Sequence, residues 1–171
     1  INSYQLLNTA RKTGVNLSII ESSRKINEKM PEHVVELVAD AFKECNKTIQ
    51  GSDILILGIS YKPDVKDIQL TPAENIIKKL KDLGANIHIY DPYFSLTNVF
   101  GINTEENLET TTLKKMDAAI VVTGHDEFNN FTISDFRLMR NPILVDTRGI
   151  FDPVEAKNAK LIFRGLGRGQ S

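Results

Sequence analysis

Residues 53–92 read DILILGISYKPDVKDIQLTPAENIIKKLKDLGANIHIYDP, and this stretch decides the fold. Its first part, residues 54–57, is an unbroken apolar run that ends at Gly58. Continuous apolarity, in place of alternation, is typical of a strand that is buried on both faces of a parallel sheet. We therefore predict a buried strand at the start of the stretch.

A helix and a second strand follow the first strand. Thr71 can cap the helix, Pro72 suits its first position, and Glu74 can complete a capping box. Apolar residues then recur at helical spacing until Gly84, and residues 86–90 read as the second strand. Together these elements predict a βαβ unit, whose crossover is right-handed in nearly all known proteins.

The loop between the first strand and the helix differs from a dinucleotide-binding loop. Ser60 and Pro63 stand where G-x-G-x-x-G has its second and third glycines. Tyr61 and Lys62 lie just past the carboxyl end of the strand, where ligands bind in open α/β sheets. An aromatic ring beside an ammonium suits a nucleotide or a phosphate. The alternative is a solvated loop lysine with a tyrosine packed beneath it.

The composition is that of an ordinary globular protein, with 171 residues of which 41% are apolar and 25% charged. A net charge of −1 gives no electrostatic sign of nucleic-acid or membrane binding. No apolar run is long enough to span a membrane, no signal peptide opens the sequence, and a single cysteine fits a reducing compartment. We therefore expect a cytoplasmic protein. The scattered histidines have no metal-ligand spacing, so no metal site is predicted.

The first fifty residues read as helices. We expect a short helix closed near Gly14, a second over residues 17–29, and a third that Pro31 opens. The third carries apolar residues at the spacing of a helix-packing seam: Val34, Val38, Ala41 and Cys45. The seam either forms a homodimer contact or covers the sheet of its own chain. Cys45 lies in this stripe, which is typical of a small core residue and not of a reactive nucleophile.

The remaining chain predicts further strands at residues 118–122, 142–146 and 161–163. Between them we expect a loop with a helical turn over 94–101, helices over 107–116 and 132–139, and a loose tail after Arg164. Arg148 follows a strand end, so we predict it at the same edge as Lys62, where two cations can neutralise a diphosphate. An internal Arg148–Asp146 pair is the alternative. His125, after another strand, either contacts ligand or caps and packs.

Five stretches, residues 24–31, 58–73, 89–92, 121–128 and 145–149, resemble the C-terminal domain of the UDP-glucose/GDP-mannose dehydrogenase family. They run in the family's order and extend over nearly the whole chain. The sequences His-Asp-Glu-Phe and Asp-Thr-Arg-Gly, with the ending over residues 163–168, are most similar to the UDP-N-acetyl-D-mannosamine dehydrogenases.

The resemblance implies an enzyme that oxidises the C6 alcohol of a nucleotide sugar to a carboxylate with two NAD. It implies that Tyr61, Lys62 and Arg148 contact the UDP-sugar. It also implies that NAD is bound mainly by an N-terminal domain, whose glycine-rich catalytic cysteine loop we expect just upstream of Ile1. On this interpretation the 171 residues alone are inactive. UDP-N-acetyl-D-mannosamine is the expected substrate, with UDP-glucose and UDP-N-acetylglucosamine as alternatives.

One departure from the family concerns residues 67–72, Asp-Ile-Gln-Leu-Thr-Pro, where many members have Asp-x-Arg-Glu-Ser-Pro. Gln69 stands at the arginine position that touches NAD in relatives, and Leu70 replaces an acid. Glutamine can form hydrogen bonds but supplies no charge. Gln69 is therefore a weakened candidate for cofactor binding.

We predict an α/β fold, a Rossmann-like parallel sheet flanked by helices and preceded by a helical segment. Residues 1–50 would form a helical linker and dimerisation segment, and residues 51–171 a UDP-sugar-binding domain. The expected partners are a UDP-sugar and a second copy of the chain, with neither nucleic acid nor membrane. Two other classes stay open: a stand-alone nucleotide-binding or regulatory module, and a dinucleotide domain with Asp91 on a ribose.

Overall fold

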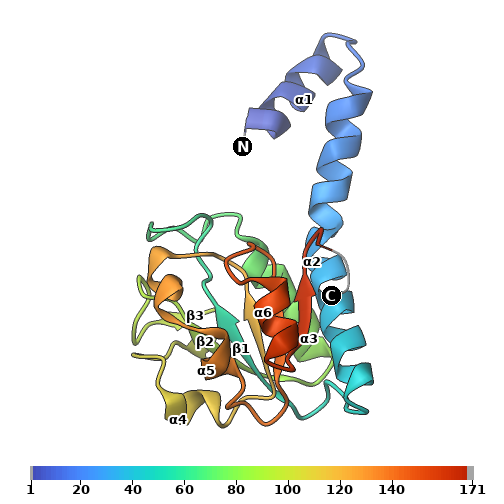
Figure 1. The fold of residues 1–171 in the computed structure, drawn as a ribbon. Helices are drawn as coiled ribbons and strands as arrows, with labels where there is room; N and C mark the ends of the chain where they lie inside the picture. Colours follow the sequence, from blue (N-terminus) through green and yellow to red (C-terminus); the bar gives the residue numbers. More distant parts are fainter. Residues whose placement is uncertain (1, 169–171) are drawn as a thin grey trace.

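Five parallel strands form the central sheet in a computed structural model that describes residues 2–168 (Figure 1). They are β1 (Asp53–Leu57), β2 (Asn86–Tyr90), β5 (Ala118–Val121), β6 (Ile143–Asp146) and β7 (Ile162–Gly165). Their order, β2-β1-β5-β6-β7, is that of a doubly wound α/β sheet. The predicted Rossmann-like fold is therefore confirmed. Residues 1 and 169–171, the outer ends of the two predicted domains, lie outside the described residues.

Helices cover both faces of this sheet. Helices α2 (Ser18–Glu44) and α3 (Pro72–Asp82) pack on one face. The other face carries α4 (Thr110–Leu113), η1 (Asp126–Asn130), α5 (Ile133–Phe136) and α6 (Pro153–Asn158). Within β1, Ile54 and Ile56 belong to the first core, and Leu55 and Leu57 to the second. Burial on both faces explains why the strands read as unbroken apolar runs.

Helix α3 begins as predicted, with one difference at its cap. The Thr71 hydroxyl oxygen accepts a hydrogen bond from the Ala73 N–H at 3.2 Å, and Pro72 is the first helical residue. The Thr71 N–H donates to the Ile68 carbonyl at 3.3 Å. Because that carbonyl already satisfies the amide, Glu74 does not complete the expected capping box.

Helix α1 (Asn2–Lys12) and the first half of α2 project from the domain as an arm (Figure 1). The predicted break at Pro31 is wrong, because α2 continues through it. A proline removes one helical hydrogen bond, and packing of the helix against the sheet offsets that cost. Pro31 itself is buried, and it is the first of the buried residues of α2.

The apolar seam of α2 covers the sheet of its own chain. Val34 is 3% exposed, and Val38 and Ala41 are fully buried in the core that they share with β1 and α3. Cys45, at the end of the helix, is partly buried against the same core. The prediction of a homodimer contact through this seam is therefore wrong, since its side chains already pack against the sheet of their own chain.

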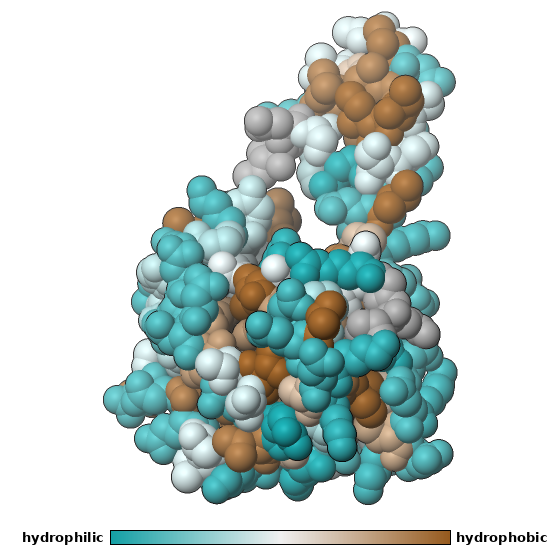
Figure 2. Space-filling model, in the orientation of Figure 1, coloured by the Kyte–Doolittle hydropathy of each residue, from teal (hydrophilic) through white to brown (hydrophobic). Residues whose placement is uncertain are grey.

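The arm instead exposes a different set of apolar side chains, which appear as brown atoms above the domain (Figure 2). Ile19 is 81% exposed and Ile26 is 65% exposed, and Leu6 and Val15 are also exposed. Within the arm, the Arg24 guanidinium lies 4.1 Å from the centre of the Tyr4 ring and ties α1 to α2. None of the helices within residues 2–168 is both long and apolar enough to cross a membrane.

The segment 94–101 does not contain the expected helical turn. It contributes to a hairpin of β3 (Asn98–Val99) and β4 (Ile102–Asn103). Phe100 and Gly101 connect the two strands with φ of 53° and 73°. A tight hairpin turn with both central residues at positive φ is of type I′. Phenylalanine is unusual at such a position, which is why the turn could not be predicted from the residue types.

Four further segments differ from prediction. Helices α4 and α5 are single turns, because consecutive threonines disfavour a longer α4 and Arg137 ends α5. Helix α6 was not predicted, although Asp152 caps it and Pro153 occupies its first position. Residues 165–168 after Arg164 are not loose: β7 continues to Gly165, and the Arg168 side chain donates to the carbonyls of Gly149 and Phe151.

Candidate functional site

The candidate site lies at the carboxyl edge of the sheet, where the chain changes direction between β1 and β5. Gly58, just after β1, has φ of 78°, and a Cβ at this position would lie 2.5 Å from the Thr123 carbonyl oxygen. Only glycine permits this approach. The Thr123 hydroxyl donates to the Ser60 carbonyl. The loops after β1 and β5 are thus joined at the point where open α/β sheets bind ligands.

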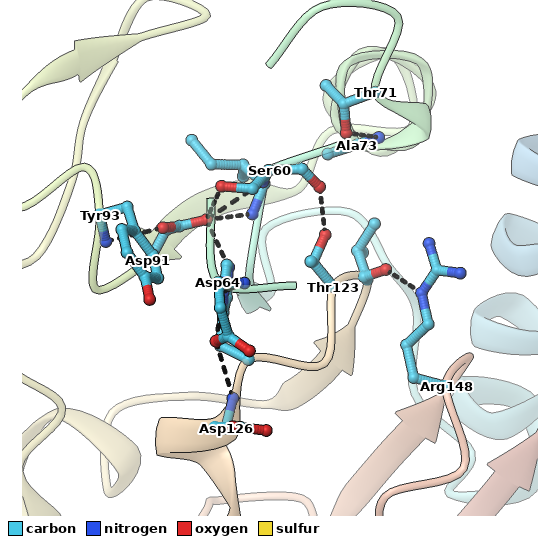
Figure 3. Close-up of polar contacts among 12 residues, drawn as sticks. Ser60, Asp64, Thr71, Ala73, Asp91, Tyr93, Thr123, Asp126 and Arg148 are labelled. Atoms are coloured by element: carbon cyan, nitrogen blue, oxygen red, sulfur yellow. Dashed lines mark hydrogen bonds and ion pairs between the residues drawn. The ribbon is translucent and has the colours of Figure 1, made fainter. Parts of the chain in front are cut away.

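Asp91 organises this edge from the end of β2 (Figure 3). Its carboxylate is fully buried. Oδ2 accepts hydrogen bonds from the Ile59 N–H at 2.8 Å and from the N–H and hydroxyl of Ser60, both at 3.1 Å. Oδ1 accepts from the Tyr93 N–H at 2.9 Å. His125 Nε2 lies 3.0 Å from Oδ2 as a further partner. Asp91 therefore fixes the start of the loop after β1.

The electrostatics of Asp91 exclude the ribose-binding role considered for it. Burial raises the pKa of this carboxyl, but hydrogen bonds from His125, Ile59 and Tyr93 outweigh it, so the pKa lies below its ordinary value. The carboxylate is ionised, enclosed and saturated with donors. A nucleotide ribose cannot reach it, and the dinucleotide hypothesis based on Asp91 is wrong.

His125 is a packing and bonding residue of the same network. The side chain is 1% exposed, with its ring stacked near Tyr93 and edge-on to Phe128. Nδ1 accepts the Asp64 N–H at 3.0 Å. Of the two roles considered for His125, the structure therefore shows packing and bonding. The sequence feature that pointed to His125 was its place in the loop after β5, at the edge where Asp91 also lies.

Tyr61 and Lys62 lie in the loop that Asp91 anchors. Both are exposed, with Tyr61 at 52%. The Tyr61 N–H donates to the Asp67 carbonyl at 2.6 Å, which closes the loop on itself. Among residues 2–168 no carboxylate forms an ion pair with the Lys62 ammonium. Tyr61 is therefore not packed beneath the lysine as a core residue, and both side chains face solvent.

Arg148 lies at the same edge, after β6. Its Nε donates to the Val122 carbonyl at 2.6 Å, which fixes the guanidinium beside the loop after β5 (Figure 3). The alternative considered for Arg148, a side-chain pair with Asp146, does not form. Asp146 instead accepts the backbone N–H groups of Arg148 at 2.8 Å, Gly149 at 2.7 Å and Phe151 at 2.9 Å. No carboxylate in the described part of the chain pairs with the Arg148 guanidinium.

A short path of contacts links the two cations. Arg148 binds the carbonyl of Val122, the neighbouring Thr123 binds the carbonyl of Ser60, and Ser60 precedes Tyr61 and Lys62. The topology has therefore brought Tyr61, Lys62 and Arg148 to one edge, as predicted. This arrangement presents two positive charges and one aromatic ring to solvent.

The residues present do not fit a dinucleotide at the β1–α3 loop. Gly58 packs against Thr123, Ser60 is buried, and Asp91 is saturated. Gln69 is exposed, and its N–H donates to the Asp67 side chain at 2.8 Å. Leu70 beside it is 66% exposed, with φ of 59°. The Gln69 side chain is thus available to a ligand held by other residues, and a contact with NAD stays a prediction.

Cys45 lacks the surroundings of a nucleophile. Burial, followed by the neighbouring Glu44, raises the pKa of its thiol, which disfavours the reactive thiolate. This environment agrees with the prediction that Cys45 is a small core residue and not a catalytic nucleophile. Residues 2–168 also contain no group of three or more histidine, cysteine or acidic side chains placed to hold a metal ion.

We expect Asp91→Asn to lower the free energy of unfolding by about 3 kcal/mol at neutral pH, because the amide cannot accept all the bonds that the carboxylate accepts. The folded-state pKa of Asp91 is lowered, so its contribution is present above about pH 4 and is lost as the pH falls through that lowered pKa. Urea unfolding from neutral to acid pH measures this. Asp82→Asn, at an exposed position of α3, is the control. An equal effect of both substitutions would contradict the prediction.

Three comparisons bear on the identity of this site. The family described as "UDP-glucose/GDP-mannose dehydrogenase family, UDP binding domain" matches residues 55–153. A UDP-N-acetyl-D-mannosamine dehydrogenase from Methanococcus aeolicus is 36% identical over 137 residues, which are 78% of this chain and 30% of that protein. The crystal structure of an NDP-N-acetyl-D-galactosaminuronic acid dehydrogenase from Methanosarcina mazei Go1 has a TM-score of 0.85 at 26% identity, over 97% of this chain and 36% of that one.

A second solved structure, of a UDP-D-ManNAc dehydrogenase from Pyrococcus horikoshii, has a TM-score of 0.81 at 27% identity, over 95% of this chain and 36% of that one. The chain thus spans about a third of the length of these relatives. The matched segment runs from β1 to the start of α6 and contains Tyr61, Lys62, Asp91, His125 and Arg148. The chain belongs to the UDP-glucose/GDP-mannose dehydrogenase family, and its α/β domain is that family's UDP-binding domain.

Proposed function

We propose that this chain is the UDP-sugar-binding part of an NAD-dependent UDP-N-acetyl-D-mannosamine 6-dehydrogenase, which oxidises the C6 alcohol of the sugar to a carboxylate. The observation that carries the proposal is the pair of cations, Lys62 and Arg148, at the switch-point edge of the sheet. Similarity to UDP-N-acetyl-D-mannosamine dehydrogenases supports the choice of sugar. We assign residues 51–171 to UDP-sugar binding and residues 1–50 to a linking segment.

The proposed contacts follow from the chemistry of the edge. A UDP-sugar carries two negative charges on its diphosphate, and Lys62 and Arg148 can neutralise them. Because the Val122 carbonyl fixes Arg148 through Nε, its terminal nitrogens remain oriented for phosphate oxygens. The exposed Tyr61 ring can stack on the uracil. These contacts involve UDP and not the sugar, so UDP-glucose and UDP-N-acetylglucosamine remain alternative substrates.

NAD enters this proposal as the hydride acceptor of the whole protein. The loop after β1 does not fit a dinucleotide, so we propose that NAD is held mainly by residues outside these 171. Gln69 is the residue of this chain that we propose to reach the cofactor. The second candidate function, a nucleotide-binding or regulatory module without chemistry, shares the UDP site and differs only in turnover.

We expect the chain to bind UDP and UDP-sugars more tightly than NAD. Each charge-assisted contact to phosphate contributes roughly 1.5–3 kcal/mol, so Lys62→Ala or Arg148→Ala should weaken UDP binding about ten- to a hundredfold. Isothermal titration calorimetry with UDP and NAD measures this. Lys114→Ala, at an exposed lysine that precedes β5 and therefore lies near the opposite edge, is the control. Tighter binding of NAD, or unchanged affinity in both variants, would refute the ligand assignment.

We expect no NADH from this chain alone with UDP-N-acetyl-D-mannosamine and NAD, and turnover by a protein that also contains the remaining family domain. The 171 residues hold no G-x-G-x-x-G, and burial disfavours the thiolate of their single cysteine. Absorbance of NADH is the measurement. Turnover by the chain that disappears in Cys45→Ser would overturn our assignment of Cys45. If the complete protein acts on no UDP-sugar, the module without chemistry is favoured.

We also propose that the chain forms a homodimer through the arm. Exposed Ile19 and Ile26 lie on the projecting part of α2, and burial of such side chains would favour association. Ile26→Asp should give a folded monomer in sedimentation, with Lys29→Asp on the same helix as control. Val38→Asp should instead unfold the domain, since it buries an unpaired charge. A stable monomer for the unmodified chain would rule the dimer out.

A further inference from the structure

The loop of residues 58–67, which carries Tyr61 and Lys62, is held at two places. Its base is bound by Asp91 through Ile59 and Ser60. Its far side is bound at Asp64, whose N–H donates to His125 Nδ1 at 3.0 Å and whose Oδ1 accepts the Asp126 N–H at 3.1 Å (Figure 3). Asp64 comes two residues after Lys62 and has φ of 59°. An L-residue rarely adopts this conformation unless its surroundings impose it.

The contacts of His125 define which ring nitrogen carries the proton. The Asp64 N–H is a donor only, so Nδ1 must present its lone pair. The proton of the neutral ring therefore lies on Nε2, which donates to Asp91 Oδ2 at 3.0 Å. In this tautomer the ring connects the buried carboxylate at the base of the loop to the backbone at its far side.

We propose that His125 is a positioning residue for the UDP-sugar: Nδ1 of its neutral ring accepts the Asp64 N–H and thereby fixes the loop that presents Lys62. The proposal rests on the proposed function, in which Lys62 binds the diphosphate. His125 itself does not reach the ligand, because its ring is enclosed by Tyr93, Phe128 and the loop.

Two substitutions separate the two contacts of the ring. The side-chain oxygen of His125→Asn can take the place of Nδ1 and accept the Asp64 N–H, but this side chain is too short to reach Asp91. The amide nitrogen of His125→Gln can take the place of Nε2 and donate to Asp91, but leaves the Asp64 N–H without its acceptor. His33→Asn, at an exposed histidine of α2, is the matched control.

The first experiment titrates the 171-residue chain with UDP-glucose, whose diphosphate does not change charge near neutral pH. We expect His125→Gln to bind about tenfold more weakly, as for the loss of one ordering hydrogen bond, and His125→Asn to stay within about threefold of the unmodified chain. Equal affinity of both variants would overturn the proposal.

The second experiment needs no ligand. Nitrogen NMR of the ring should show His125 protonated at Nε2 and not at Nδ1 at neutral pH. The Asp64 amide should be protected from hydrogen exchange in the unmodified chain and in His125→Asn, and unprotected in His125→Gln. Protection in all three, or in none, would overturn the role of His125. If the protection pattern is found but the unmodified chain binds no UDP-sugar, the proposed function fails while the connection between His125 and the loop stands.

Discussion

A single buried carboxylate determines the arrangement of the whole carboxyl edge. Ionised Asp91 has no access to solvent, and a charge in that position would be strongly destabilising without donors around it. The loop after β1, the turn after β2 and the loop after β5 each supply at least one donor. Because all of them converge on the same two oxygens, the three segments have one joint arrangement. Tyr61 and Lys62 are exposed, but the backbone that precedes them is held in place by the hydrogen bonds of Ile59 and Ser60 to Asp91.

The sequence predicted those parts of the fold in which local and long-range requirements agree. Strands β1, β5 and β6 are buried on both faces, so residues 54–57, 118–121 and 143–145 had to be apolar. Thr71-Pro72 begins α3 wherever the helix packs. Prediction from the sequence failed where tertiary packing overrides the local conformational preference of a residue. Pro31 reads as a helix start, but the buried residues after it hold α2 continuous. The hairpin at Phe100 depends on a backbone conformation that its side chain disfavours.

The candidate site also combines features that the sequence predicts with features that it does not. Tyr61, Lys62 and Arg148 were predicted because parallel topology alone places residues after strand ends at one edge. The hydrogen bonds that hold this edge together could not be predicted from the sequence. Asp91 follows the second strand of a βαβ unit, as ribose-binding acids do, and only contacts 31 to 34 residues away in sequence reveal it as a structural anchor. His125 contacts Asp64 across 61 residues, and no local pattern encodes such a pairing.

The distribution of charge at this edge bears on the kind of ligand that it accepts. Two carboxylates at the carboxyl edge, Asp91 after β2 and Asp146 at the end of β6, are both bound to backbone N–H groups. Neither is free to pair with Lys62 or Arg148, so both cations face solvent without a carboxylate partner among residues 2–168. Neither is free to bind a ribose hydroxyl. The same hydrogen bonds that order the loops therefore keep Asp91 and Asp146 from pairing with Lys62 or Arg148 and from binding a ribose.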